Sequence, residues 1–63
     1  MGIGEILRQR REQLGMTQDQ VAARADISKP YLSNIETGKA NAPTDTVLDA
    51  LERALGFEQG QLL

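Results

Sequence analysis

The sequence predicts an all-α fold, a compact bundle of four to five short helices. In several segments the apolar residues recur at three- and four-residue spacing, which is typical of amphipathic helices, and no segment alternates like a half-buried strand. A serine or threonine precedes most of these segments and a glycine follows them, as at the two ends of many helices. A chain of 63 residues buries only about 60% of the surface that its unfolded form exposes, so we expect one small domain over residues 1–63.

The first helix is expected over residues 3–14. Its apolar residues share one stripe, made of Ile3, Ile6, Leu7 and Leu14. Gly15 supplies a stop at the C-terminal end. On the outer side, the spacing of charges predicts ion pairs of Arg8 with Glu5 and with Glu12.

The second helix is expected over residues 18–25. Thr17 is followed three residues later by Gln20, which is the pattern of a capping box. The apolar residues after it fall at the spacing of a buried face: Val21, Ala22 and Ala25.

A tight turn over residues 26–28 leads into a third helix, expected over residues 29–36. Ser28 is its expected N-cap, and Pro30 suits a first turn because the N–H groups there have no intrahelical acceptor. Gly38 is expected to end the helix in a left-handed conformation. Two short helices joined by so short a turn form a helix-turn-helix motif.

The fourth helix is expected over residues 45–55, with Thr44 as N-cap and Gly56 as terminator. Its inward residues are Val47, Leu48, Leu51, Ala54 and Leu55. The tail predicts a last short helix over residues 58–62 that packs Phe57 and Leu62.

Three carboxylates lie along one side of the fourth helix: Asp45, Asp49 and Glu52. We interpret them as a solvated face, in which Asp49 forms an ion pair with Arg53 four residues later. A docking site for a basic partner is the alternative interpretation.

Two charged residues fall on stripes that should be buried. Arg11 lies four residues after Leu7 in the first helix, and Glu36 lies four residues after Leu32 in the third. An unpaired buried charge is costly, so we expect these two residues to form a structural ion pair that joins the two helices. The alternative is that each long side chain reaches past the edge of the core into water.

The outward side of the third helix has an unusual composition for a helix surface. Its residues are Lys29, Pro30, Ser33, Asn34 and Thr37. A face that serves only solubility is usually rich in strong helix formers, whereas serine, asparagine and proline are poor ones. Asparagine can pair with an adenine edge, lysine can donate to guanine, and serine can bond to either base. The row therefore predicts a surface that reads the major groove of double-stranded DNA.

Some residues of this region also have ordinary structural interpretations. Tyr31 is expected to pack at the edge of the core with its hydroxyl in water rather than on a phosphate. A solvated surface residue is the alternative for Asn34, and an interaction with the helix dipole is the alternative for Lys39.

Composition argues against several classes of function. The chain has no cysteine and no histidine, so thiolate and imidazole ligands and the commonest general base are absent. We expect neither an enzyme nor a metal or cofactor site. No apolar run approaches the ~20 residues that span a bilayer, so we expect a cytoplasmic protein without a membrane partner.

The net charge of −2 is unevenly distributed along the chain. Residues 1–39 carry six basic and five acidic side chains, whereas the remainder carries one basic and four acidic. A surface that faces phosphate is therefore expected within the first forty residues.

The chain resembles the lambda-repressor-like, or Xre-type, helix-turn-helix domain of phage repressors, Cro proteins and many bacterial regulators. The matching residues are "LRQRREQLGMTQDQVAARADISKPYLSNIETGK", then "PTDTVLDALERALGF" and the closing "QLL", which together cover nearly the whole chain. The resemblance implies that the third helix enters the major groove and that a homodimer binds two half-sites about one helical turn apart.

The resemblance also implies which residues touch DNA. Bases would be read by Ser28, Lys29, Pro30, Ser33 and Asn34. Phosphates would be bound by Arg11, Thr17, Gln18, Thr37, Lys39 and Asn41, partly through backbone N–H groups at helix starts. A pair like that of Arg11 and Glu36 also occurs in this family, with the arginine facing the DNA backbone.

Departures from the family pattern lower the phosphate affinity that we expect of a single domain. Asp26 stands where the motif usually has a glycine, the loop after Lys39 lacks the basic residues of many phage members, and Glu52 replaces a small residue. We therefore expect weak binding by the monomer and a dependence on dimerisation.

These observations predict a sequence-specific transcriptional regulator of bacterial or phage type, a repressor that acts as a dimer on a pseudo-palindromic operator. The alternative is a protein-interaction module of the same fold, antitoxin-like or a helical platform, with little affinity for DNA. The sequence is compatible both with a stand-alone protein and with a regulator that carries a further domain.

Overall fold

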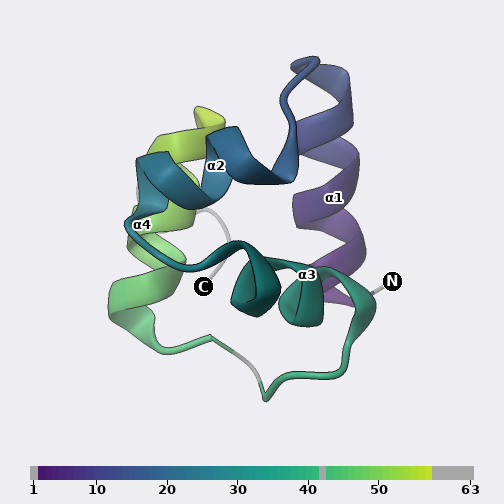
Figure 1. The fold of residues 1–63 in the computed structure, drawn as a ribbon, viewed down its shortest axis with the longest axis vertical. Coiled ribbons are helices and arrows are strands. Elements are labelled where there is room, and N and C mark those ends of the chain that lie inside the picture. Colours follow the sequence, from purple (N-terminus) through teal and green to yellow (C-terminus); the bar gives the residue numbers. More distant parts are fainter. Residues whose placement is uncertain (1, 42, 58–63) are drawn as a thin grey trace.

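The computed structural model describes residues 2–41 and 43–57, which contain four α-helices and no strand (Figure 1). The helices are α1 (Ile3–Gln13), α2 (Gln18–Ala25), α3 (Lys29–Thr37) and α4 (Asp45–Leu55). The all-α fold class is confirmed, and each of these boundaries lies within one residue of its expected position. The expected helix over residues 58–62 lies outside the described residues. None of the described helices is long and apolar enough to cross a membrane.

The helix starts follow the capping signals of the sequence. Thr17 and Gln20 form both halves of the capping box: the Gln20 backbone N–H donates to Thr17 Oγ1 (3.1 Å), and the Thr17 N–H donates to Gln20 Oε1 (2.9 Å). Ser28 Oγ accepts from the Tyr31 N–H (3.2 Å), and Thr44 Oγ1 accepts from the Val47 N–H (3.3 Å). Local side-chain chemistry therefore determines where α2, α3 and α4 begin.

The turn of the helix-turn-helix motif depends on a left-handed residue that is not glycine. Asp26 ends α2 with φ 57° and ψ 43°, and it is the only non-glycine residue with positive φ in the described part of the chain. Aspartate tolerates this conformation better than most side chains do. Its backbone N–H donates to the Ala23 carbonyl (3.3 Å), which closes the end of α2.

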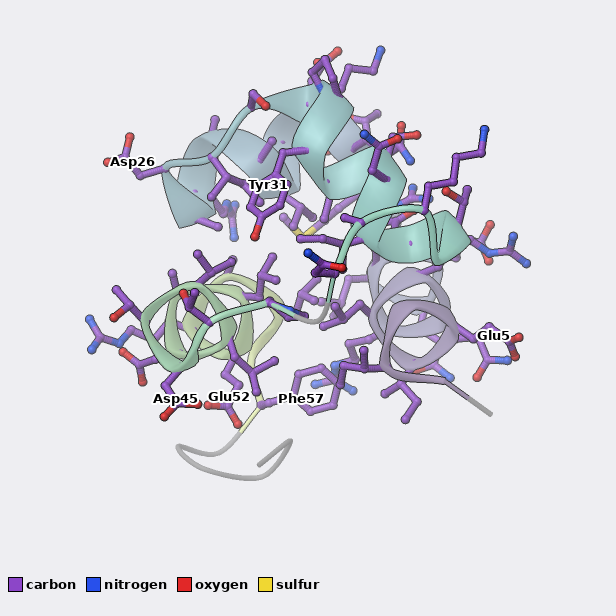
Figure 2. All side chains as sticks on the ribbon, turned by 90° about the horizontal axis from the view of Figure 1, so that it is seen from below. Glu5, Asp26, Tyr31, Asp45, Glu52 and Phe57 are labelled. Atoms are coloured by element: carbon purple, nitrogen blue, oxygen red, sulfur yellow. The ribbon has the colours of Figure 1, made fainter. Side chains whose placement is uncertain are left out.

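All four helices contribute to the core. The fully buried large apolar side chains are Leu7, Val21, Leu32, Leu51 and Leu55. Tyr31 is half-buried and packs against this core, and Figure 2 shows its ring pointing toward the middle of the molecule, which confirms the core-edge interpretation.

Two expectations about the core were wrong. Leu14 is 44% exposed, because α1 ends at Gln13 and Leu14 lies at the C-cap, where the chain turns toward Gly15. Glu52 is only 2% exposed and so does not belong to a solvated face. The reason is that Glu52 lies next to Leu51 and three residues before Leu55, within the broad buried side of α4.

The exposed helix surfaces contain two of the three expected ion pairs. Asp49 and Arg53 are paired on α4, as expected for i,i+4 neighbours. Arg8 Nε lies 3.9 Å from Glu12 Oε1 on α1, whereas no ion pair between Glu5 and Arg8 is found. Such exposed pairs contribute little to stability.

Gly4 allows the start of α1 to touch the backbone of α3. It is buried, and a Cβ built on it would lie 2.2 Å from the carbonyl oxygen of Ile35 and 2.9 Å from that of Glu36. A side chain at this position would force the two helices apart. The position of α3 relative to α1 therefore depends on a residue without a side chain.

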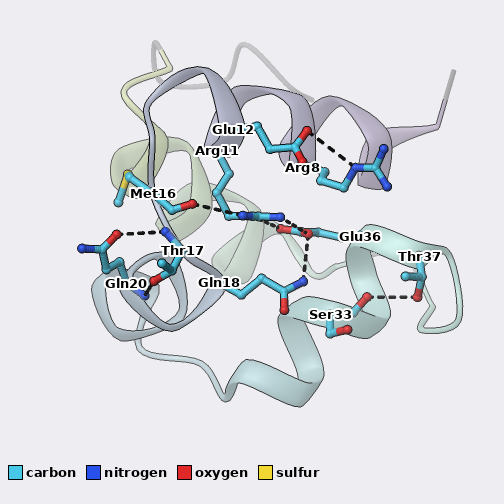
Figure 3. Close-up of polar contacts among 10 residues, drawn as sticks. All are labelled: Arg8, Arg11, Glu12, Met16, Thr17, Gln18, Gln20, Ser33, Glu36 and Thr37. Atoms are coloured by element: carbon cyan, nitrogen blue, oxygen red, sulfur yellow. Dashed lines mark hydrogen bonds and ion pairs between the residues drawn. The ribbon is translucent and has the colours of Figure 1, made fainter.

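The ion pair between Arg11 and Glu36 joins the same two helices (Figure 3). Arg11 Nε donates to Glu36 Oε2 (2.9 Å), and Nη2 donates to Oε1 (3.1 Å), so the pair is bidentate. Gln18 Nε2 adds a third hydrogen bond to Oε1 (3.0 Å). The Glu36 side chain is 1% exposed and that of Arg11 is 14% exposed. One buried carboxylate therefore connects α1, α2 and α3.

Gly4→Ala is expected to lower the free energy of unfolding by about 1–3 kcal/mol, because the added methyl group must displace the α3 backbone. Urea denaturation followed by circular dichroism measures the change. Gly2→Ala is the matched control, since a Cβ there would meet nothing within 4 Å. Equal stability of the two variants would contradict the close approach of α1 and α3.

Arg11→Met is expected to cost about 3–5 kcal/mol, because it leaves the buried Glu36 carboxylate with only one neutral donor. A domain of this size has only roughly 3–9 kcal/mol of stability, so the variant should unfold at a much lower urea concentration than the wild type.

The double variant Arg11→Met/Glu36→Leu should recover much of this loss, because no unpaired charge remains buried. Arg8→Met is the control, since Arg8 has only an exposed partner, and it should change stability by less than about 1 kcal/mol. If the losses of Arg11→Met and Glu36→Leu simply add in the double variant, the two residues are not energetically coupled.

Candidate nucleic-acid interface

The outward side of α3 carries the polar row that the sequence singles out. Lys29, Pro30, Asn34 and Thr37 are exposed and Ser33 is half-buried. The opposite side of the helix buries Leu32, Ile35 and Glu36. The core and the Glu36 ion pair therefore hold α3 in one orientation, with the row facing solvent.

Ser28 at the N-cap of α3 and Asn34 within the row keep hydrogen-bonding capacity. Ser28 Oγ accepts a bond from the Tyr31 N–H, which leaves the hydroxyl proton available for a further bond. The Asn34 side chain makes no hydrogen bond within the described residues, so its donor and acceptor are both available. The backbone carbonyl of Asn34, by contrast, accepts from the N–H groups of Lys39 (2.9 Å) and Ala40 (3.1 Å). The Asn34 backbone is thus held in place while its amide is free.

The Thr37 hydroxyl is already hydrogen-bonded, whereas the polar side chains that follow α3 are exposed. Thr37 Oγ1 donates to the backbone carbonyl of Ser33 (3.0 Å), so its proton is already used within α3 (Figure 3). Lys39 and Asn41 are exposed, and Lys39 forms no ion pair with any described residue. Lys39 therefore offers an unpaired cation beside the C-terminal end of α3.

The start of α2 lies beside the start of α3. An open groove of about 450 Å³ connects them, lined by Arg11, Met16, Thr17, Gln18, Asp19 and Lys29. The first N–H groups of α2 have no intrahelical acceptor, and the helix dipole places partial positive charge there. This is the environment in which a phosphate group binds a helix N-terminus.

Arg11 lines this groove and stays protonated, although the buried Glu36 carboxylate offsets its charge. Its pKa is raised above the ordinary value, chiefly by the hydrogen bond with Glu36, with smaller contributions from the charges of Glu36 and Glu12, while burial acts in the opposite direction. Its Nη1 donates to the Met16 carbonyl (3.0 Å). Three of its five N–H donors are thus used inside the protein, and two remain.

The structure adds one residue that sequence reasoning missed. Asp19 Oδ2 lies 3.7 Å from Lys29 Nζ, and both side chains are largely exposed. Asp19 follows the N-cap of α2, where acidic residues commonly favour the helix dipole, so the sequence contains no signal for this pair. The crossing of α2 and α3 brings the two residues together. A carboxylate therefore lies at the edge of the surface that would face DNA.

Within residues 2–41 and 43–57, no group of three or more acidic side chains is arranged to hold a metal ion.

Comparisons with known proteins agree with this arrangement. The sequence profile of the helix-turn-helix family matches residues 7–58. An uncharacterised HTH-type transcriptional regulator of Sinorhizobium fredii, y4dJ, is 38% identical over 61 residues, which make up 97% of this chain and 78% of that protein. The immunity repressor protein of Bacillus phage phi105 is 34% identical over 58 residues, 92% of this chain and 40% of the repressor. The chain thus spans less than half of the phage protein.

A solved structure shows the same fold. The restriction-modification controller protein C.AhdI from Aeromonas hydrophila superposes with a TM-score of 0.85 at 27% sequence identity, over 95% of this chain and 89% of that one. Together, the profile, the relatives and the fold show that the chain belongs to the lambda-repressor-like, Xre-type helix-turn-helix family of DNA-binding transcriptional regulators, which are not enzymes.

Proposed function

We propose that this chain represses transcription by binding a pseudo-palindromic operator as a homodimer, with α3 of each copy in the major groove. The observation that carries the proposal is the outward row of α3. It presents uncharged donors and acceptors on a rigid helix, next to the groove at the start of α2. The similarity to a phage immunity repressor supports repression as the mode of regulation.

The base-reading roles follow from the side chains at the N-terminal end of α3 and along its outward row, among which Lys29 would first have to release Asp19. The Asn34 amide can donate to and accept from an adenine edge, and Lys29 can donate to guanine O6 and N7. Ser28 and Ser33 can bond to either base, and the ring of Pro30 can contact a thymine methyl group.

The phosphate-binding roles follow from position and charge. Thr17 and Gln18 stand at the start of α2, where backbone N–H groups would meet one phosphate, and Arg11 would approach the same strand with its remaining donors. Lys39 and Asn41 would bind a second phosphate beyond the end of α3. Thr37 would join them only by exchanging its bond to Ser33 for a phosphate oxygen.

Dimerisation is proposed because one domain has a weak electrostatic attraction for DNA. The net charge is −2, and Asp19 occupies the edge of the proposed surface. Two linked copies on half-sites about 34 Å apart would double the number of DNA contacts. Once the first copy is bound, the second binds its half-site as an intramolecular step, so the entropic cost of association is not incurred twice in full.

A protein-interaction module of the same fold is the second candidate, and the acidic surface of α4 favours it. That surface is smaller than the sequence suggested, because Glu52 is buried, Asp49 is half-buried and only Asp45 is exposed. We therefore rank it below DNA binding.

Asn34→Ala is expected to relax sequence preference at one position of each half-site, since each good base contact is worth roughly 1–3 kcal/mol of discrimination. Selection of bound duplexes from a random-sequence pool at low salt, read by sequencing, measures the preference. The wild-type chain should enrich a two-fold-symmetric motif that the variant blurs.

Lys39→Ala is the control for this selection. Loss of a phosphate contact should weaken binding to all sequences alike and lower the salt dependence by about one counterion per protomer, without changing the enriched motif. An unchanged motif for Asn34→Ala would show that α3 does not read bases through this residue. Failure to enrich any motif, even with an artificially dimerised chain, would favour the protein-interaction module.

Asp19→Asn is expected to tighten operator binding roughly fivefold, about 1 kcal/mol, because it releases Lys29 and removes a negative charge close to phosphate. Fluorescence anisotropy at several salt concentrations measures the affinity and its salt dependence. Asp49→Asn is the matched control, since it removes one negative charge and breaks the i,i+4 ion pair with Arg53 on α4, outside the proposed DNA surface. If the two substitutions change the operator affinity equally, the change in net charge alone explains the effect, and Asp19 does not lie close to phosphate.

A further inference from the structure

A second basic surface lies away from the α3 row. In Figure 1 the C-terminal ends of α1 and α4 lie at the top of the molecule beside α2, while α3 lies below them. An open groove of about 380 Å³ is formed where these three helices meet. Its arginines are Arg10 of α1, Arg24 of α2 and Arg53 of α4. None of these residues belongs to the proposed DNA surface.

The groove concentrates positive charge in an acidic chain. Three of the seven basic residues line it, although the net charge is −2. Each arginine is in the last turn of its helix, where the carbonyl end favours a cation. The helix ends carry only about half a negative charge each, so they do not neutralise three guanidinium groups. Arg53 is paired with Asp49, whereas Arg10 and Arg24 have no carboxylate partner within the described residues.

Arg10 is held in place by the protein itself. Its Nε donates to the Leu55 carbonyl oxygen at the end of α4 (2.9 Å), and its guanidinium lies 5.3 Å from the centre of the Phe57 ring. A guanidinium fixed in this way loses little conformational freedom when it binds a carboxylate. Arg10 is therefore a pre-ordered cation.

The groove also has an apolar part. Leu14 is 44% exposed and is the only large hydrophobic side chain so exposed within residues 2–41 and 43–57. Met16 beside it is half-buried. A single exposed leucine is common on protein surfaces, but here it adjoins three arginines in one concave site.

We propose that this groove binds an acidic segment of a partner protein, with a large apolar side chain of the segment against Leu14 and Met16 and its carboxylates on Arg10 and Arg24. Charge complementarity identifies the occupant, because an acidic segment would neutralise the unpaired guanidinium groups. The phosphates of a second DNA duplex could meet the arginines, but they would leave Leu14 and Met16 in contact with water. An acidic, apolar peptide satisfies both parts of the groove.

The test is selection of short random peptides displayed on phage against the wild-type chain, followed by affinity measurements on the enriched peptides. We expect the enriched peptides to combine aspartate or glutamate with leucine, phenylalanine or tryptophan. They should bind Leu14→Ser/Arg24→Glu at least about tenfold more weakly, as expected for loss of two anchors. Arg8→Glu, which changes an exposed arginine of α1 outside the groove, should bind them within about twofold of the wild type.

Several outcomes would overturn the proposal. The proposal is wrong if no peptide is enriched or if the enriched peptides are neutral or basic. It is also wrong if the enriched peptides bind Leu14→Ser/Arg24→Glu as tightly as the wild type. Finally, it is wrong if duplex DNA displaces the peptides equally well from the wild type and from Leu14→Ser, since the groove would then bind phosphate alone. Both substituted side chains are exposed, and circular dichroism verifies the fold. Arg24→Ala alone, with a smaller loss of affinity, replaces the double variant should that chain fail to fold. These variants should bind operator DNA as the wild type does, because the groove lies outside the α3 row. A failure of the peptide proposal is therefore distinguishable from a failure of the proposed DNA binding.

Discussion

The buried carboxylate of Glu36 is the constraint on which the arrangement of the first three helices depends. A carboxylate with a side chain only 1% exposed must be neutralised and hydrogen-bonded, and the structure does this with two donors of Arg11 and one of Gln18. These donors come from α1 and from the start of α2, while Glu36 belongs to α3. One charged group therefore specifies how three helices meet, and a different packing would leave it unsatisfied.

The same constraint sets the surface that would meet DNA. Because Glu36 points inward, Asn34 and Thr37 on either side of it point outward, and the row of α3 has a single orientation. Because Gln18 binds the same carboxylate, the start of α2 is held close to α3. Arg11 completes both features, since it neutralises Glu36 and keeps two donors beside the groove at the start of α2. One network thus both holds the helices together and positions the residues that we propose to bind DNA.

All basic residues except Arg8, which is paired with Glu12 on α1, are divided between two surfaces of this small domain. Arg11, Lys29 and Lys39 lie at or beside the α3 row, whereas Arg10, Arg24 and Arg53 lie at helix ends on another groove. The positive charge at the α3 row is reduced by a carboxylate, since Asp19 pairs with Lys29. The modest charge of the proposed DNA surface is the reason why we propose binding by two copies. The second set lies outside the proposed DNA surface, which is why we propose a different, acidic partner for it.

The sequence by itself determined the local features of this protein: helix starts at Thr17, Ser28 and Thr44, a stop at Gly38, and the polar row of α3. It also predicted the pair of Arg11 and Glu36, because helical periodicity places both on buried stripes. Only the tertiary structure decided that Leu14 is exposed, that Glu52 is buried, that Gly4 touches α3, and that Asp19 meets Lys29. Capping and periodicity act within one turn or one helix, and therefore they can be read from neighbouring residues. Burial at helix ends and contacts between helices depend on how the elements cross, which is set by the packing of the whole core.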